Sequence, residues 1–208
     1  MQNRLALPPW MNLPALQDAA SRCKACPLHR DTTQTVFGAG PTHAEMMLIG
    51  DAPGAQDDIL GEPFHGAAGK ILDRCLQEAG LSRQRIYITN IVKHFPHITG
   101  LTGRRRAAKP LPENIAACRP WLSAELAVVR PKIIICLGPL TARTLIGKPV
   151  DLARQRGEIY TTPFCPRVMV THHPAGLLHP HGNRVEKTAD FIADLKKAAL
   201  ALQNIQPF

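Results

Sequence analysis

Two loop segments carry side chains that could support acid–base or electrostatic chemistry. Asp51 lies in the motif GDAPG, and His172 and His173 lie in HHP. A carboxylate can accept a proton or stabilise a developing cation, and an imidazole can donate a hydrogen bond to an oxygen that gains negative charge. In a simpler interpretation, Asp51 caps a helix and the histidines end a strand. Because both segments follow predicted strands, where α/β proteins bind ligands, the functional interpretation gains weight.

Two further segments between predicted elements carry polar or aromatic groups. The motif GEPFHG presents one aromatic ring, Phe64, between glycines. That ring could stack on a flat ligand such as a nucleic-acid base, or it could fill the core. The stretch Asn90–His94 follows another predicted strand, so we expect it near Asp51.

The motif CKACP has the spacing of a metal-binding corner. Cys23 and Cys26 can hold two positions of a metal ion or cluster, and two more ligands must come from elsewhere. Cys118 and His94 are the candidates, with Cys165 in reserve. The spacing does not separate zinc from an iron–sulfur cluster, and two unligated thiols remain the alternative. Since no export signal is evident, we expect thiols or ligands and no disulfides.

The segment GLTGRRRAAKP is strongly basic. It contains Arg104, Arg105, Arg106 and Lys109 and has no acidic residue. Such a segment suits a phosphate backbone, to which each contact adds salt-dependent affinity. The alternative is a solvated basic loop.

Apolar runs and helical periodicity predict the elements that position these segments. Four runs predict strands: Met46–Gly50, Ile86–Val92, Lys132–Leu137 and Arg167–Thr171. Four segments predict helices: Gly69–Ala79, Pro112–Val129, Leu140–Ile146 and Ala189–Leu202. Their alternation predicts an α/β fold, a three-layer α/β/α sandwich with a central four-stranded parallel sheet. We expect a single domain over residues 1–208, with residues 1–20 as an N-terminal extension.

Composition narrows the class of protein. The 208 residues include 25 Lys and Arg against 16 Asp and Glu, a formal charge of +9, which favours a nucleic acid over a membrane as partner. With 45% hydrophobic residues, the chain is not disordered. No apolar run reaches about 18 residues, so no membrane span is expected. The proline-broken N-terminal segment does not resemble a secretory signal, and we expect a cytoplasmic protein.

Six motifs occur in an order that resembles a known family. They are CKAC, GDAPGAQDD with GEPFHGAAGKILD, YITNIVKHF, AACRPWL, IIICLG and HHPAGLL. This order, from about Cys23 to Leu178, resembles the iron–sulfur uracil-DNA glycosylases of family 4. The VKHF motif with a basic insert before AACRPWL is similar to the UdgX branch, whose members crosslink to uracil in DNA.

The resemblance implies a role for each motif residue. It implies Asp51 and His173 as catalytic residues, facing the sugar and the leaving base. It implies a substrate-binding set of Ala52, Gly54, Phe64 and Asn90, with Phe64 stacking on uracil and Asn90 reading its edge. It implies Cys23, Cys26, His94 and Cys118 as ligands of a structural [4Fe-4S] cluster. The implied partner is uracil-containing DNA, single-stranded with double-stranded DNA left open, bound by a monomer at the nucleoid.

Three positions depart from the family pattern. The family usually has Glu at the position of Asp51, and the UdgX pattern has Gln at Ala52 and its crosslinking His at Ala107. With no nucleophile at Ala107, we expect water to complete the reaction and leave an abasic site. Three alternatives stay open: a uracil-DNA binding protein with weak or no turnover, a glycosylase for another deaminated base such as hypoxanthine, and a metal-bearing regulatory protein.

Overall fold

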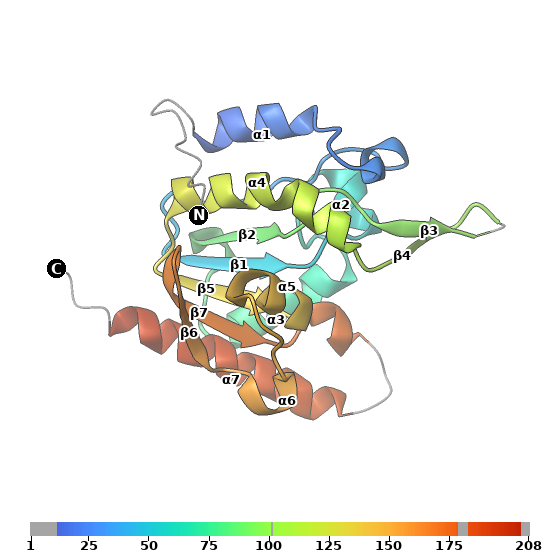
Figure 1. Ribbon diagram of the computed structural model, residues 1–208. Coiled ribbons are helices and arrows are strands. Elements are labelled where there is room, and N and C mark those ends of the chain that lie inside the picture. Colours follow the sequence, from blue (N-terminus) through green and yellow to red (C-terminus); the bar gives the residue numbers. More distant parts are fainter. Residues whose placement is uncertain (1–11, 101, 179–182, 205–208) are drawn as a thin grey trace.

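A five-stranded sheet lies at the centre of the computed structural model, which describes residues 12–100, 102–178 and 183–204 (Figure 1). The strand order is β2-β1-β5-β7-β6. The strands are β1 (Met46–Gly50), β2 (Ile86–Asn90), β5 (Ile133–Leu137), β6 (Ile159–Thr162) and β7 (Cys165–Thr171). Strands β2, β1, β5 and β7 pair in parallel. Every residue of β1, β2 and β5 is buried, as expected for a parallel sheet covered on two sides.

Helices cover both faces of the sheet. On one face lie α1 (Leu13–Ser21), α4 (Pro112–Val129), α5 (Pro139–Ile146) and the short α6 (Leu152–Gln155). On the other lie α3 (Ala67–Glu78) and α7 (Arg184–Gln203). The other described helical segments are the short helix α2 (Ala55–Leu60) and the 3-10 turns η1 (Pro27–Arg30), η2 (Arg83–Arg85) and η3 (Pro174–Leu177). The three-layer α/β/α architecture is therefore confirmed.

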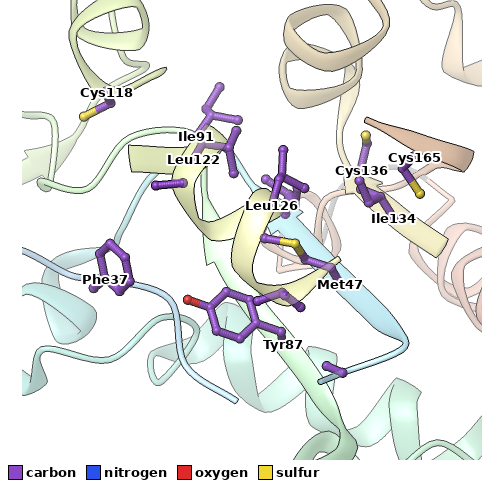
Figure 2. Close-up of a cluster of buried hydrophobic side chains, with 14 of the residues drawn as sticks. Phe37, Met47, Tyr87, Ile91, Cys118, Leu122, Leu126, Ile134, Cys136 and Cys165 are labelled. Carbon is purple, nitrogen blue, oxygen red and sulfur yellow. The ribbon is translucent and has the colours of Figure 1, made fainter. Parts of the chain in front are cut away.

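Side chains that alternate along the strands form two separate cores. On the α4 face, Met47, Tyr87 and Ile134 pack against Leu122 and Leu126 (Figure 2). The opposite strand residues join a second core with side chains of α3 and α7: Leu48, Ile135, Leu72, Leu76 and Phe191. This two-sided burial is why each strand reads as a continuous apolar run in the sequence.

The four predicted strands form the parallel part of the sheet, and a fifth strand that the sequence did not reveal joins them. Strand β6 adds to the sheet antiparallel to β7. Its residues alternate between exposed and half-buried, whereas those of β2, the strand at the other edge, are all buried. A short, polar sequence that follows Gly157 gives no apolar run, so the pattern that identified the other strands misses it.

The basic segment forms a hairpin instead of the expected loop. Strands β3 (His97–Thr99) and β4 (Arg105–Ala107) pair antiparallel. Figure 1 shows this hairpin projecting from the body, beyond the end of the sheet toward which β1 and β2 point. The basic residues are therefore at the edge of the molecule where the parallel strands end.

The termini of the elements differ from the expected ones by a few residues. Helix α4 has the expected bounds, whereas α7 begins at Arg184, five residues earlier than expected. Of the expected N-terminal extension, residues 1–11 lie outside the described residues, and α1 begins at Leu13. Across the described ranges, every helix is too short or too polar to cross a membrane.

Candidate active site

The segments that follow the parallel strands meet at one edge of the sheet, as the sequence predicted. Gly50 at the end of β1 is in register with Asn90 at the end of β2. A Cβ atom added to Gly50 would lie 2.5 Å from Asn90 Oδ1 and 2.5 Å from Phe64 Cζ. After β5, a Cβ on Gly138 would lie 3.2 Å from His173 Cβ. Glycine at both positions therefore lets these side chains approach the strand ends closely.

Four predicted site residues gather at this edge, and we call them the strand-end cluster: Asp51, Phe64, Asn90 and His173. The rings of Phe64 and His173 lie 5.8 Å apart between centroids, inclined by 35°. The charge of Asp51 acts on His173, so the carboxylate and the imidazole share one environment. Elements distant in sequence thus bring a carboxylate, an aromatic ring, an amide and an imidazole together.

Asp51 is half-buried and held through one oxygen. Its Oδ1 accepts hydrogen bonds from Thr141 Oγ1 at 2.6 Å and from the Thr141 backbone N–H at 3.2 Å. Thr141 is fully buried in the first turn of α5. The second carboxylate oxygen of Asp51, Oδ2, makes no hydrogen bond with the described residues. The carboxylate is thereby fixed in orientation while one oxygen remains available.

His173 is held as a neutral hydrogen-bond donor. The backbone N–H of Ala175 donates to His173 Nδ1 at 3.1 Å, so Nδ1 carries the lone pair and Nε2 carries the hydrogen. Burial lowers the pKa of His173 below its ordinary value, an effect that the charge of Asp51 opposes. Within the described part of the chain, the buried Nε2 has no hydrogen-bond partner. The site therefore presents an N–H group toward an acceptor that the protein does not supply.

Asn90 has fewer hydrogen bonds to its side chain than the other polar residues of the cluster. It is 1% exposed, and neither its Oδ1 nor its Nδ2 has a hydrogen-bond partner among the described residues. Buried amides are nearly always paired, and leaving one unpaired costs about 1–3 kcal/mol. A donor and an acceptor side by side, both buried and unpaired, are suited to a ligand that presents the complementary pair.

Phe64 is fixed by its backbone and by a buried carboxylate nearby. Its φ angle of 58° lies in the left-handed region, which is rare for a bulky residue. Asp57 Oδ1 accepts from the backbone N–H of His65 at 2.8 Å, and Asp57 Oδ2 accepts from that of Gly54 at 2.9 Å. One side chain thus joins the GDAPG and GEPFHG segments.

The remaining predicted substrate-binding residues have internal contacts. Ala52 packs against the core of the α4 face, and the N–H of Gly54 is taken by Asp57. His172 turns away from the cluster toward α7, where its Nε2 lies 3.7 Å from Asp190 Oδ2. Burial lowers the pKa of His172, which the charge of Asp190 opposes.

The predicted metal-binding residues, which we call the cysteine group, are Cys23, Cys26, His94 and Cys118. Trp121 Nε1 donates to Cys23 Sγ at 3.2 Å, and the N–H of Lys93 donates to Cys118 Sγ at 3.5 Å. Burial raises the pKa of Cys118 to about 11, opposed by Lys93 and reinforced by the charges of Cys26 and Cys23. Cys23 therefore contacts α4, the helix that carries Cys118.

His94 has one ring nitrogen that makes no hydrogen bond with the described residues. Its Nε2 is 3.0 Å from Thr35 Oγ1, whereas its buried Nδ1 has no partner in the described ranges. No three His, Cys, Asp or Glu side chains of those ranges are close enough together to hold a single metal ion. Cysteine thiolates and a histidine imidazole are ligand types that both zinc and iron–sulfur clusters take.

The basic hairpin separates its arginines. Arg104, Arg106 and Lys109 are exposed. Arg105 instead points inward, where its Nη1 donates to Asp58 Oδ2 at 3.0 Å, and its guanidinium lies 5.7 Å from the centre of the Phe95 ring. The structure therefore assigns to Arg105 an internal contact that its neighbours lack.

Sequence reasoning missed several supporting residues. Thr141 lies in α5, which follows β5, and its contact with Asp51 spans 90 residues. Asp57 and Trp121 lie inside the quoted motifs, so their position in those motifs was the available signal. Each supports a functional side chain through a contact that sequence order does not reveal.

Comparison with known proteins identifies the family. The sequence model described as the Uracil DNA glycosylase superfamily matches residues 37–196. The chain belongs to the uracil DNA glycosylase superfamily. The match spans the whole strand-end cluster, so the predicted family is confirmed.

Several curated relatives are type-4 uracil-DNA glycosylases. The type-4 uracil-DNA glycosylase of Archaeoglobus fulgidus is 34% identical over 176 residues, covering 81% of this chain and 84% of the relative. That of Saccharolobus solfataricus is 36% identical, covering 81% and 78%. These relatives agree with the family-4 resemblance, whereas similarity to the UdgX branch stays a prediction.

A solved structure shares the glycosylase-superfamily fold seen here. The crystal structure of wild-type Pedobacter heparinus SMUG2 aligns with a TM-score of 0.57 at 13% identity, covering 78% of this chain and 77% of that one. At that identity the likeness concerns the fold alone.

Proposed function

We propose that this protein is a uracil-DNA glycosylase, which hydrolyses the N-glycosidic bond of uracil in DNA and leaves an abasic site. The observation that carries the proposal is the strand-end cluster. A neutral imidazole N–H, a free carboxylate oxygen and an unpaired amide converge beside an aromatic ring. The names of the type-4 relatives support the same reaction.

Uracil is recognised by Asn90 and Phe64. The Asn90 amide offers one donor and one acceptor, which match an adjacent carbonyl and N–H on the edge of uracil. Phe64 stacks on the face of the base once it has left the DNA stack. Since pairing with uracil would satisfy both buried amide atoms, binding removes a cost that the free protein carries.

His173 stabilises the leaving base. The bond from C1′ to uracil N1 breaks with its electron pair moving to N1, and the negative charge spreads onto the ring oxygens. The Nε2–H of His173 donates to such an oxygen, and its fixed tautomer requires no rearrangement during the reaction. The lowered pKa of His173 keeps it neutral, so it acts by hydrogen bonding and keeps its proton.

Asp51 acts on the sugar and on water. Loss of the base leaves an electron-poor, oxocarbenium-like sugar, which a nearby carboxylate stabilises. Water then forms a bond to C1′ and passes a proton to Oδ2 of Asp51 and on to solvent, while the released uracil anion takes a proton from solvent. The bonds from Thr141 hold Oδ1, which leaves Oδ2 for this task.

The exposed cations of the hairpin bind the DNA backbone. Arg106 lies on β4, and Arg104 and Lys109 lie on either side of that strand in the sequence. The hairpin projects beyond the end of the sheet toward which β1 and β2 point (Figure 1), where these cations would contact phosphates flanking the flipped nucleotide. Ala107 provides no nucleophile, so the product is released without a covalent link. We further propose that a monomer acts on single-stranded and double-stranded DNA in the cytoplasm, at the nucleoid.

The cysteine group would hold a structural [4Fe-4S] cluster. The N–H donors of Trp121 and Lys93 that point at Cys23 and Cys118 suit thiolates, because they offset negative charge on sulfur. The unpaired Nδ1 of His94 suits the fourth ligand. When bound, the cluster would tie the segment before β1 to α4 and to the segment after β2.

A strand-cleavage assay tests the function. Purified protein is incubated with labelled oligonucleotides that contain uracil, hypoxanthine or thymine, and alkali then cleaves at abasic sites. We expect cleavage of the uracil strand, strong loss in His173→Gln and Asp51→Asn, and retention in His172→Gln as the matched control. Cleavage of only the hypoxanthine strand, a bound but intact uracil strand, or a complex that survives denaturation would each contradict the proposal.

A further inference from the structure

A buried ion pair lies directly behind the strand-end cluster. Lys93 and Glu125 have side chains that are 1% and 0% exposed, and Lys93 Nζ lies 2.5 Å from Glu125 Oε2. Removing two charges from water costs so much that a buried pair rarely adds net stability over apolar residues. We therefore expect the Lys93–Glu125 pair to have a role other than stabilising the fold.

Lys93 uses its remaining hydrogens to close a turn around Asn90. Its Nζ donates to the backbone carbonyl of Asn90 at 2.8 Å and to Thr89 Oγ1 at 2.6 Å. With Glu125, these partners use all three donors of the ammonium group. The cation thus holds the main chain of the residue whose amide lies in the strand-end cluster.

Glu125 fixes the other side of the network. Its Oε1 accepts from Tyr87 Oη at 3.0 Å, from Thr89 Oγ1 at 2.9 Å and from the N–H of Gly38 at 3.0 Å. Burial, together with the charge of Glu125, raises the pKa of Tyr87 far above its ordinary value, so its hydroxyl remains a donor. The carboxylate therefore anchors Lys93 to β2, to α4 and to the segment before β1.

Asn90 depends on this main-chain anchor. No hydrogen bond from the described residues holds its side-chain amide, so only packing against its surroundings and the position of its backbone set the direction of the amide. The backbone N–H of Lys93 also donates to Cys118 Sγ on α4. The segment after β2 is thus held to α4 at two points.

We propose that Lys93, anchored by Glu125, is a positioning residue that directs the Asn90 amide and thereby sets the preference for uracil over cytosine, which has an amino donor and a ring acceptor where uracil has a carbonyl acceptor and an N–H donor. This inference rests on the function proposed above. It predicts that removal of the ion pair weakens discrimination between bases through Asn90, while the fold and the other residues of the strand-end cluster persist.

The test removes both charges together. Lys93→Met alone would leave Glu125 buried and unpaired, which is strongly destabilising. The double variant Lys93→Met with Glu125→Gln is neutral and keeps the Oε1 acceptor. Its matched control is Lys132→Met with Glu45→Gln, which removes an exposed pair of the same residue types at 2.5 Å.

Two readouts are measured: kcat/KM for excision of uracil, and the Kd ratio, which is the Kd for a cytosine-containing oligonucleotide divided by the Kd for a uracil-containing one. We expect the Lys93–Glu125 variant to lose about tenfold to a hundredfold in kcat/KM, the size of effect that a displaced recognition group produces, and to lose base discrimination. In an Asn90→Ala background the same two changes should have less than about a twofold further effect on the Kd ratio, because coupled residues are not additive. The control variant should match the wild type.

Three results would overturn the proposal: an unchanged Kd ratio, an equal further loss in the Asn90→Ala background, or an equal loss in the control variant. If the double variant does not fold, Glu125→Gln alone, which changes a single atom of the side chain, must still reduce the Kd ratio. A wild-type protein that excises no uracil would instead contradict the proposed function, so the two failures are distinguishable.

Discussion

Arg105 and Arg106 are neighbours in sequence that should behave differently when each is changed to alanine. Both lie on β4, and each substitution removes one positive charge, so the net charge of the two variants is identical. Arg105 donates to the fully buried Asp58, whereas Arg106 is exposed. The pair of variants therefore separates an internal contact from a contact with DNA.

The structure sets the magnitude of the Arg105→Ala effect. Breaking a fully buried ion pair costs about 3–5 kcal/mol, and an exposed pair contributes about 0–1 kcal/mol. The Arg105 side chain is 31% exposed, and Asp58 keeps hydrogen bonds from Thr33 N at 2.9 Å and Thr33 Oγ1 at 2.9 Å. We therefore expect a loss of about 2 kcal/mol, which lowers Tm by about 4–8 °C for a chain of this size.

Arg106→Ala should change DNA binding instead of stability. Exposed substitutions usually stay within about 0.5 kcal/mol. Loss of one phosphate contact should reduce the slope of log affinity against log salt by about 0.7 for single-stranded DNA. Thermal unfolding and a salt titration with a uracil oligonucleotide measure the two effects. A lowered slope with an unchanged Tm in Arg105→Ala would refute the assignment of Arg105 to the interior.

Three further predictions concern the site residues. His173→Gln should lower the rate of uracil excision by about 10²–10³-fold and leave DNA affinity within about twofold, because it removes a donor that acts on charge developing in the transition state. Single-turnover kinetics and a binding titration measure the two quantities, and equal losses in both would contradict the prediction. Burial lowers the pKa of His172 and His173, so below about pH 6.5 the unfolded chain binds more protons than the folded one. The free energy of unfolding should therefore be greatest above about pH 6.5 and decrease as the pH falls below it. Urea unfolding at several pH values measures this dependence, which should be flatter in His173→Gln. Anaerobic reconstitution with iron and sulfide should give a visible absorption band and bound iron. Cys118→Ser should abolish both, whereas Cys136→Ser, which changes a fully buried thiol outside the cysteine group, should retain them. Loss in both variants, or in neither, would argue against a specific cluster.

The sequence by itself determined the central architecture and the residues of the candidate site. Strands β1, β2, β5 and β7 were identifiable because burial on both faces leaves continuous apolar runs. Since parallel strands direct their carboxyl ends to one edge, the segments carrying Asp51, Asn90 and His173 were expected to meet there. Ordered motifs added Phe64 and the cysteine group through family resemblance.

Only the tertiary structure decided how those residues are supported. Strand β6 lacks an apolar run because its residues are exposed or half-buried, unlike those of β2, the other edge strand, which are all buried. The inward direction of Arg105 follows from the register of the hairpin, and the bond from Thr141 to Asp51 spans 90 residues. Lys93 and Glu125 lie 32 residues apart, and nothing local in the sequence marks either as buried. Such contacts depend on which side chains the packing of distant elements brings together, and local patterns of hydrophobicity do not encode that information.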